Sequence, residues 1–221
     1  MFFVFAYIVL SIPFMLFYPT KVIHKERLPK TKKYIGTSNH YSNLDSILYA
    51  FNFRRKFRFM AKKELFKNKL FGAVLKGLGG YPVDREHPSP SVYKQTLGYL
   101  KDNKTVFIFP EGTRNKDDST GEMLSVKSGI VTFASRGEAD IVPMVLYRKS
   151  KLFRKNYIIV GEPFKIQGVN PKKLTKEETE ANVKRYEQTM KDLRLELDTI
   201  LNTKNKKIAK KEAKKLENKT K

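Results

Sequence analysis

The sequence predicts an α/β protein, with a mixed, largely parallel sheet flanked by helices and a membrane-associated helical segment at the N-terminus. Two observations predict the sheet. Short apolar segments alternate with segments of helical spacing, and residues 105–109 (TVFIF) are apolar throughout, which is typical of a strand buried on both faces. A third observation predicts the N-terminal segment, because residues 1–18 contain no charged side chain.

The elements follow one another in the order expected of a sheet covered on both faces. Strands are expected at residues 34–38, 56–60, 105–109, 141–147 and 157–160, with another that begins at residue 81. Helices are expected from a cap near Ser42 or Asn43, and over residues 65–78, 90–100, 128–135 and 175–201. The last of these helices is amphipathic, with its apolar side chains on one side.

The length of 221 residues suits one α/β domain with a sizeable core. We expect a membrane anchor over residues 1–20, one catalytic domain over residues 21–202, and a Lys-rich tail, frayed or disordered, over residues 203–221. The chain contains no cysteine. This excludes disulfides, thiolate zinc sites and a cysteine acyl intermediate.

The apolar N-terminal segment is compatible with two membrane arrangements. A straight helix of this length would reach about 27 Å, which is barely the thickness of a bilayer core. Pro13 would kink it, so a bent helix that enters one leaflet and a full span both fit. A signal peptide, which this segment matches poorly, and a buried helix of a soluble protein are the alternatives. Six basic residues follow between Lys21 and Lys33, so we expect the catalytic domain on the cytoplasmic face of the cell membrane.

The charge balance favours an anionic partner. The formal net charge is +23, from 45 Lys and Arg against 22 Asp and Glu. Nucleic acid, anionic lipid headgroups and an acidic carrier protein would all be attracted. Residues 53–69 mix basic and aromatic side chains, which suits a membrane interface, single-stranded RNA, or simply a solvated helix face above core aromatics. No RNA-recognition motif accompanies this segment, so we expect membrane lipids rather than nucleic acid as the partner.

The first candidate for chemistry lies in residues 38–45 (SNHYSNLD). His40 would lie in a strand-to-helix loop and Asp45 in the first helical turn. Residues five apart on a regular helix diverge, so the two side chains meet only if the loop folds back. The carboxylate would then fix one ring nitrogen and leave the other as a base. The alternative is a surface histidine beside an Asp that merely favours the helix dipole.

The second candidate is a set of groups that could bind an anion. Residues 109–114 (FPEGTR) follow the buried strand, where Gly112 allows a tight turn that exposes amides and Arg114 offers a planar fork for phosphate. Arg85 follows another strand, and Lys127 precedes a helix start. An ordinary polar loop and a solvated lysine are the alternatives.

Together these segments resemble the glycerophospholipid acyltransferase family, and within it the bacterial 1-acyl-glycerol-3-phosphate (lysophosphatidic acid) acyltransferases. Four family motifs occur in the family's order: Asn-His-x-x-x-x-Asp at residues 39–45, a motif ending in Asp-Arg at residues 81–85, Phe-Pro-Glu-Gly-Thr-Arg at residues 109–114, and a hydrophobic-Pro-hydrophobic strand at residues 141–145. The first and third are specific as a pair, while the other two are weak alone. Asn115 departs from the Ser that often follows the third motif.

The resemblance implies transfer of a fatty acyl chain from acyl carrier protein or coenzyme A to the sn-2 hydroxyl of 1-acyl-glycerol-3-phosphate, which gives phosphatidic acid. His40, oriented by Asp45, would be the base. The implied acceptor-binding residues are Arg85, Glu111, Gly112, Thr113, Arg114 and Lys127. We interpret Glu111 as a support for an arginine rather than a group that touches substrate.

The chain carries no pattern for a further cofactor. Its three histidines are far apart in the sequence, and neither a Walker loop nor a Rossmann glycine pattern is present, so no metal and no cofactor beyond the thioester is expected. Without a cysteine or a Gly-x-Ser-x-Gly elbow, we expect direct transfer rather than an acyl-enzyme. The alternatives are an acyltransferase acting on glycerol-3-phosphate or another lysophospholipid, and a basic membrane-surface or RNA-binding protein without catalysis.

Overall fold

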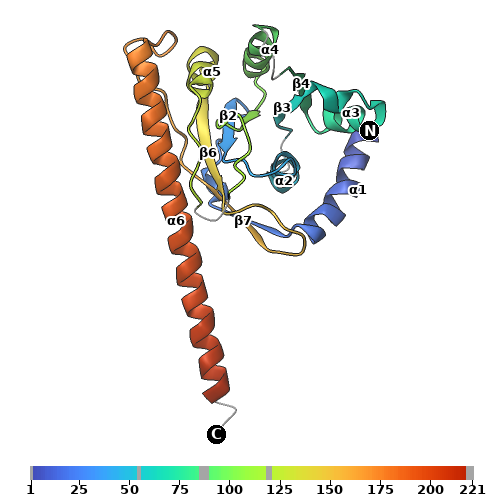
Figure 1. Ribbon diagram of the computed structural model, residues 1–221, viewed down its shortest axis with the longest axis vertical. Helices are drawn as coiled ribbons and strands as arrows, with labels where there is room; N and C mark the ends of the chain where they lie inside the picture. The colour runs from blue at the N-terminus through green and yellow to red at the C-terminus, as the bar shows by residue number, and fades with distance from the viewer. Residues whose placement is uncertain (1, 54–55, 85–89, 118–120, 218–221) are drawn as a thin grey trace.

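A seven-stranded sheet in the order β1-β7-β6-β2-β5-β3-β4 forms the centre of the molecule (Figure 1). This computed structural model describes residues 2–53, 56–84, 90–117 and 121–217. The strands are β1 (Thr20–Ile23), β2 (Tyr34–Ser38), β3 (Arg58–Lys62), β4 (Gly80–Val83), β5 (Val106–Ile108), β6 (Asp140–Leu146) and β7 (Asn156–Val160). Neighbouring strands are parallel except for the antiparallel pair β6 and β7. The predicted mixed, largely parallel sheet is confirmed.

Helices cover both faces of this sheet. They are α1 (Phe2–Phe17), α2 (Asp45–Phe53), α3 (Lys69–Gly77), α4 (Pro90–Lys101), α5 (Gly129–Gly137) and α6 (Lys176–Glu217), with short 3₁₀ segments at Lys25–Arg27 and Lys63–Phe66. Figure 1 shows α5 and α6 on one side of the strands, and α1, α2 and α3 on the other.

The alternation of side chains along the strands explains the two layers. In β5, Val106 and Ile108 belong to a core with α4, α5 and α6, whereas Phe107 between them belongs to a second core with α2. The same alternation places Ile35 in the first core and Tyr34 in the second. Because successive strand side chains point to opposite faces, a strand that is apolar at every position is buried on both.

Two central strands bring the first and third motifs together. β2 and β5 are parallel neighbours, with Ile35 opposite Val106 and Thr37 opposite Ile108. Their carboxyl ends therefore lie at the same edge of the sheet, where open α/β sheets place their sites. The loop that contains His40 follows β2, and residues 109–114 follow β5.

The helix predicted over residues 65–78 is wrong in its first part. The structure has a 3₁₀ segment at Lys63–Phe66 and begins α3 at Lys69. Asn68 caps the new helix, because its side chain accepts a hydrogen bond from the Phe71 N–H at 3.0 Å. The end of the helix agrees with the prediction, since Gly79 has φ of 101° and a Cβ there would lie 1.9 Å from the Phe57 carbonyl oxygen.

The expected frayed tail is also corrected, because α6 continues from Lys176 to Glu217. Figure 1 shows the C-terminal half of this helix extending beyond the sheet. Residues 202–217 contain neither Gly nor Pro and are rich in Lys, Ala and Glu, which favour helix. A charge run therefore does not by itself mean the loss of helical structure.

The N-terminal segment forms α1, with Pro13 inside the helix. Its C-terminal part packs on α2, where the rings of Phe14 and Phe51 lie 5.2 Å apart. Among the residues that the structure describes, no helix combines the length and apolarity needed to cross a bilayer. The structure thus shows a helix at the predicted position, and its association with a membrane stays a prediction.

Candidate active site

His40 and Asp45 meet in the loop between β2 and α2, as predicted. His40 Nδ1 lies 2.9 Å from Asp45 Oδ2. The carboxylate also accepts from the backbone N–H groups of Tyr41 (2.7 Å) and Ser42 (2.8 Å), and from the Ser42 hydroxyl at 3.0 Å. These bonds fold the loop back onto the first residue of α2. One carboxylate therefore holds both the shape of the loop and the orientation of His40. Asp45 is fully buried, so water does not compete for these hydrogen bonds.

The dyad determines which ring nitrogen of His40 can act as a base. An ionised carboxylate only accepts hydrogen bonds, so the Nδ1 that faces Asp45 carries the proton. Nε2 is then the acceptor. The ring also stacks on Phe109, with ring centres 3.9 Å apart and planes inclined by 13°. His40 is held by a hydrogen bond on one edge and an aromatic face beside it.

Glu111 joins the His40 loop to the third motif. It is buried, and its Oε1 accepts from the His40 backbone N–H at 2.8 Å. Its Oε2 accepts from the Leu124 N–H at 3.0 Å. The Asn115 N–H in turn donates to the His40 carbonyl at 2.7 Å. Both backbone polar groups of His40 are therefore bonded to the segment that follows β5.

The environment of Glu111 changes its protonation. Burial raises the pKa of Glu111 to about 7, although the hydrogen bonds from Leu124 and His40 lower it. The sequence interpretation that Glu111 supports an arginine differs from this geometry, because the side chain reaches two backbone amides. Its partners are invisible in the sequence because Leu124 is brought to it by the fold. A direct role of Glu111 in binding the acceptor stays a prediction.

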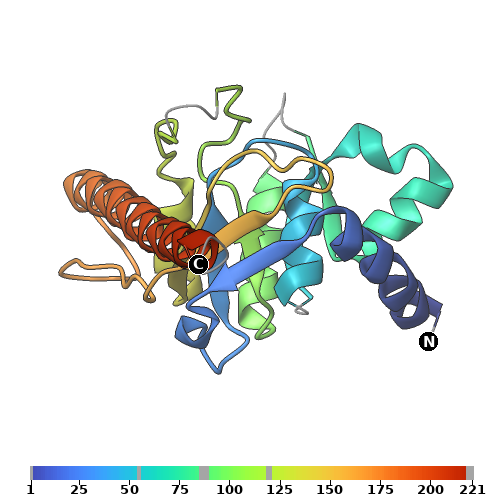
Figure 2. The same ribbon diagram turned by 90° about the horizontal axis from the view of Figure 1, so that it is seen from below.

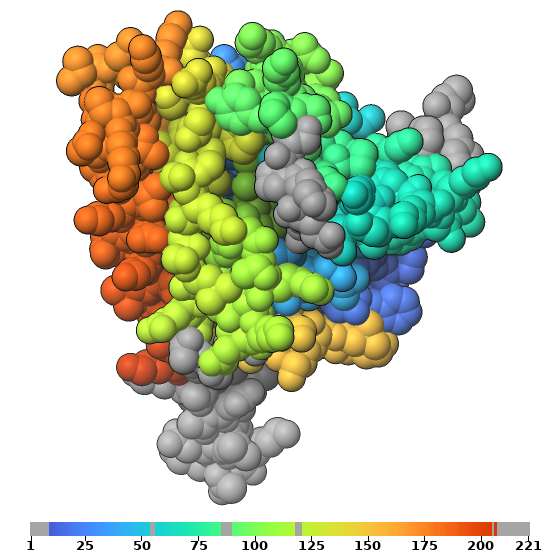
Figure 3. All heavy atoms as spheres, turned by 45° about the horizontal axis from the view of Figure 1, so that its top comes forward, coloured from blue at the N-terminus to red at the C-terminus, as the bar shows by residue number. Residues whose placement is uncertain are grey.

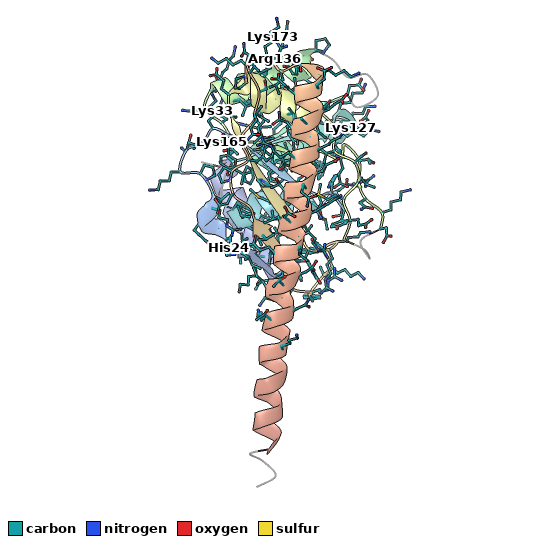
Figure 4. All side chains as sticks on the ribbon, turned by 90° about the vertical axis from the view of Figure 1, so that its left-hand side faces the viewer. His24, Lys33, Lys127, Arg136, Lys165 and Lys173 are labelled. Carbon is teal, nitrogen blue, oxygen red and sulfur yellow. The ribbon has the colours of Figure 1, made fainter. Side chains whose placement is uncertain are left out.

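Two of the predicted cationic residues, Arg114 and Lys127, lie near the same histidine. Arg114 is exposed, with Nη1 3.3 Å from the Asn43 side-chain oxygen. Lys127 is also exposed, and its backbone N–H donates to the Pro110 carbonyl at 2.9 Å. Figure 4 shows Lys127 on one side of α6 and Lys33 and Lys165 on the other, so positive charge is spread around the molecule.

The turn of the third motif brings Lys127 close. Gly112 has φ of 69°, and a Cβ built there would lie 2.9 Å from Lys127 Cε. The lysine stem thus packs against the glycine backbone. Thr113 is exposed beside it. Arg85 lies outside the described residues, so its predicted part in the site stays a prediction.

Two largely apolar cavities meet at His40. The first, about 410 Å³, is lined by side chains of the sheet edge, α4 and α5, together with Gly112 and Lys127. The second, about 390 Å³, is lined by α2, β3 and α3, together with Arg114. Both share His40, Phe59, Met60 and Phe109 as lining residues. Figure 3 shows the face on which α4, in green, lies beside the yellow-green segment that follows β5.

Sequence reasoning missed most of these cavity walls. Tyr93 on α4, Phe133 on α5 and Leu75 on α3 come from three helices that are distant in the sequence. The one sequence feature that marks these residues is their apolar spacing along a helix. That spacing predicts a buried face, but it does not distinguish a residue that fills the core from one that lines a cavity. The rings of Tyr93 and Phe133 lie 5.2 Å apart and close the wall between α4 and α5.

Asn39 of the first motif has a structural role. Its side-chain amide donates to the Leu146 carbonyl at 2.9 Å and accepts from the Leu146 N–H at 2.8 Å. Leu146 ends β6, the strand that contains the hydrophobic-Pro-hydrophobic motif. Asn39 is buried, and this pair of bonds ties the first motif to the fourth.

An oriented, buried histidine lies in the loop after β2, with exposed cations and apolar cavities around it. These features define an α/β protein with a candidate active site at the carboxyl edge of its sheet. No group of three or more side chains that could hold a metal ion occurs among the residues described. The prediction of no metal and no cofactor beyond the thioester stays a prediction.

Comparison with known proteins identifies the family within that class. A family model described as Acyltransferase matches residues 19–147, more than half of the chain. The chain belongs to this acyltransferase family.

Individual relatives agree with the family assignment. The chain is 36% identical over 186 residues to the 1-acyl-sn-glycerol-3-phosphate acyltransferase of Bacillus subtilis, covering 81% of this chain and 90% of the relative. It is 34% identical over 122 residues to the Streptococcus pneumoniae protein of the same name, covering 54% of this chain and 44% of the relative. The crystal structure of the 1-acyl-sn-glycerophosphate (LPA) acyltransferase from Thermotoga maritima superposes with a TM-score of 0.60 at 25% identity, covering 82% of this chain and 71% of that one.

Proposed function

We propose that this protein is a 1-acylglycerol-3-phosphate O-acyltransferase, which moves a fatty acyl chain from a thioester to the sn-2 hydroxyl of lysophosphatidic acid and forms phosphatidic acid. The observation that carries the proposal is the meeting of two apolar cavities at the oriented His40, with a cation in the wall of each. Family membership and the names of the relatives support the same reaction.

The reaction follows from the two nitrogens of His40. Nε2 removes the proton from the acceptor hydroxyl as its oxygen attacks the thioester carbonyl. The carbon–sulfur bond breaks, and the imidazolium returns that proton to the departing thiolate. Asp45 stabilises the imidazolium between these two transfers because it faces Nδ1 at 2.9 Å. The acyl group passes directly from donor to acceptor in this scheme.

The cationic side chains orient the acceptor. Arg114 and Lys127 would bind its phosphate, with the turn at Gly112 and Thr113 beside them and Arg85 added by the family motif. Glu111 contributes by fixing the backbone of His40, in addition to the acceptor-binding role that its motif implies. Holding hydroxyl and thioester in line near His40 supplies much of the rate enhancement of such an enzyme.

The pair of apolar cavities favours an acceptor that already carries an acyl chain. Two chains, one from the thioester and one from the acceptor, can then approach His40 from separate cavities. Glycerol-3-phosphate has no chain to fill the second cavity, so it is the weaker candidate. The basic surface suits either acyl carrier protein or a coenzyme A thioester as donor. We place the catalytic domain on the cytoplasmic face of the membrane, supported by the apolar α1 and the basic residues that follow it.

An assay with purified protein tests this proposal. Lysophosphatidic acid, glycerol-3-phosphate and a lysophospholipid without a terminal phosphate are compared as acceptors, each with acyl carrier protein and coenzyme A thioesters. We expect phosphatidic acid from lysophosphatidic acid, and a loss of about 10³-fold in kcat for His40→Ala with the fold unchanged by circular dichroism. Equal turnover of His40→Ala, or transfer only to an acceptor without phosphate, would contradict the proposal.

A further inference from the structure

The connection between β6 and β7 exposes two large apolar side chains. Leu152 is 52% exposed and Phe153 is 70% exposed. Residues 148–155 (RKSKLFRK) surround them with basic side chains and contain no acid. Neither side chain contributes to a core cluster or lines either cavity that meets at His40. The chemistry derived above therefore gives no role to a basic loop that presents leucine and phenylalanine to solvent.

The fold holds Phe153 in this exposed position. Its φ of 57° lies in the left-handed region, which costs a bulky residue roughly 1–2 kcal/mol. The Phe153 N–H donates to the Phe17 carbonyl at 2.7 Å, and the two rings meet edge to face with centres 5.4 Å apart. The Asn156 N–H adds a bond of 2.8 Å to the Pro19 carbonyl. These bonds attach the loop to the end of α1.

The exposed side chains of α1 continue the same apolar surface. Ile12 is 60% exposed, Leu16 71% and Phe17 44%. Phe17 contacts Phe153, so the surface runs from α1 onto the loop without interruption. Figures 1 and 2 both show the loop that precedes β7 close to the end of α1. Lys151 and Lys155 are exposed on either side of the apolar pair.

We propose that the β6–β7 loop is a second membrane-contact element, which inserts Leu152 and Phe153 into the apolar layer of an anionic phospholipid bilayer beside α1. Apolar rings enter the acyl region, while lysine ammonium groups reach the anionic headgroups at its border. The charge decides the partner, because a second copy of this chain would bring another strongly positive surface against it. The inference goes beyond acyl transfer and rests on the proposed membrane position of α1.

The absence of tryptophan from the chain makes a residue-specific test possible. Phe153→Trp introduces a single indole at the loop tip, and Val169→Trp, at a position 99% exposed before α6, is the matched control. Both proteins are mixed with vesicles of phosphatidylcholine alone, or of phosphatidylcholine with phosphatidylglycerol, with and without brominated acyl chains. We expect a blue shift and bromine quenching for Phe153→Trp on the anionic vesicles, and neither for Val169→Trp.

Sedimentation with vesicles measures how strongly the two side chains contribute to membrane binding. Leu152→Ser with Phe153→Ser should weaken sedimentation with anionic vesicles by about tenfold, whereas Val169→Ser should not change it. Both proteins should retain activity on detergent-dispersed lysophosphatidic acid, so a failed acyltransferase assay and a failed insertion are separate outcomes.

Four results would overturn the proposal. They are vesicle binding without an indole shift at residue 153, equal shifts at residues 153 and 169, a shift that depends on protein concentration without vesicles, and no sedimentation with any vesicle. The third would assign the surface to self-association instead.

Discussion

The two halves of the active site differ in how firmly the fold holds them. His40, Asp45 and Glu111 are buried, and each is bonded to backbone groups of a neighbouring segment. Arg114 and Lys127 are exposed and reach the site from loops. The proposed base must keep one orientation and one tautomer, whereas the cations proposed to bind a mobile lipid phosphate gain from access to solvent. Substitutions on the buried side should therefore alter kcat and stability together, and those on the exposed side should alter acceptor KM alone.

Among substitutions that leave His40 in place, Asp45→Asn should give the largest effect. It removes the carboxylate charge that orients His40 and leaves one accepting oxygen where the carboxylate has two. We expect kcat to fall at least about 100-fold and the free energy of unfolding to fall by roughly 2 kcal/mol. Steady-state kinetics and urea unfolding measure the two quantities. If stability were unchanged and the acceptor KM rose strongly, Asp45 would behave like the exposed cations, and the distinction between the two halves would be wrong.

Arg114→Ala should raise the KM for lysophosphatidic acid about 30-fold, which corresponds to roughly 2 kcal/mol of lost phosphate binding. Its exposure predicts a change in unfolding free energy within about 0.5 kcal/mol. Lys116→Ala, which removes an exposed cation two residues away, is the matched control and should change neither. A kcat loss as large as that of Asp45→Asn would mean that the guanidinium acts in the chemical step.

Glu111 connects the His40 loop to the segment after β5, and Glu111→Gln tests this connection. The quantity to measure is the pH dependence of the free energy of unfolding. The folded pKa of about 7 exceeds the ordinary value of 4.5, so the folded chain binds more protons than the unfolded chain between them. This contribution to stability is complete below about 4.5 and is lost as pH rises through 7. The difference in unfolding free energy between wild type and Glu111→Gln should shift against wild type by about 1–3 kcal/mol over that window. A constant difference from pH 4.5 to 8 would show that Glu111 is ionised throughout.

Gly112→Ala should give the smallest effect, near 1 kcal/mol in stability, because alanine tolerates φ of 69° poorly and its Cβ meets the Lys127 stem. We expect a few-fold rise in acceptor KM as the lysine is displaced. A double-mutant cycle with Lys127→Ala checks this contact. Strict additivity of the two KM changes would show that glycine and lysine act independently.

The sequence predicts the buried half of the site better than the exposed half. The sequence predicted that His40 and Asp45 meet only if the strand-to-helix loop folds back, with a surface histidine as the alternative, and the structure shows the contact at 2.9 Å. The burial of β5 also followed, because it is apolar at every position and lies between β2 and β3 inside the sheet. The partners of Glu111 did not follow, since Leu124 reaches it only through the fold of residues 115–124.

The cavity walls and the full length of α6 could not be predicted from the sequence, for different reasons. Tyr93, Phe133 and Leu75 read as core residues because a side chain that lines a cavity and one that fills a core share the same spacing. The extension of α6 to Glu217 was missed because a run of lysines was taken to mean disorder. Propensity, rather than charge, decides helix formation in a segment without Gly or Pro.

The short connection between α1 and β1 has a mechanical consequence. Only two residues separate Phe17 from Thr20, and β1 is bonded along its length to β7 at the edge of the sheet. Two residues span less than about 8 Å, so the catalytic domain can neither swing nor rise far from α1, which we propose lies in lipid. The depth at which α1 settles would then set the height of His40 above the bilayer. A flexible insertion after Phe17 would let the enzyme tumble at the surface and uncouple catalysis from bilayer thickness.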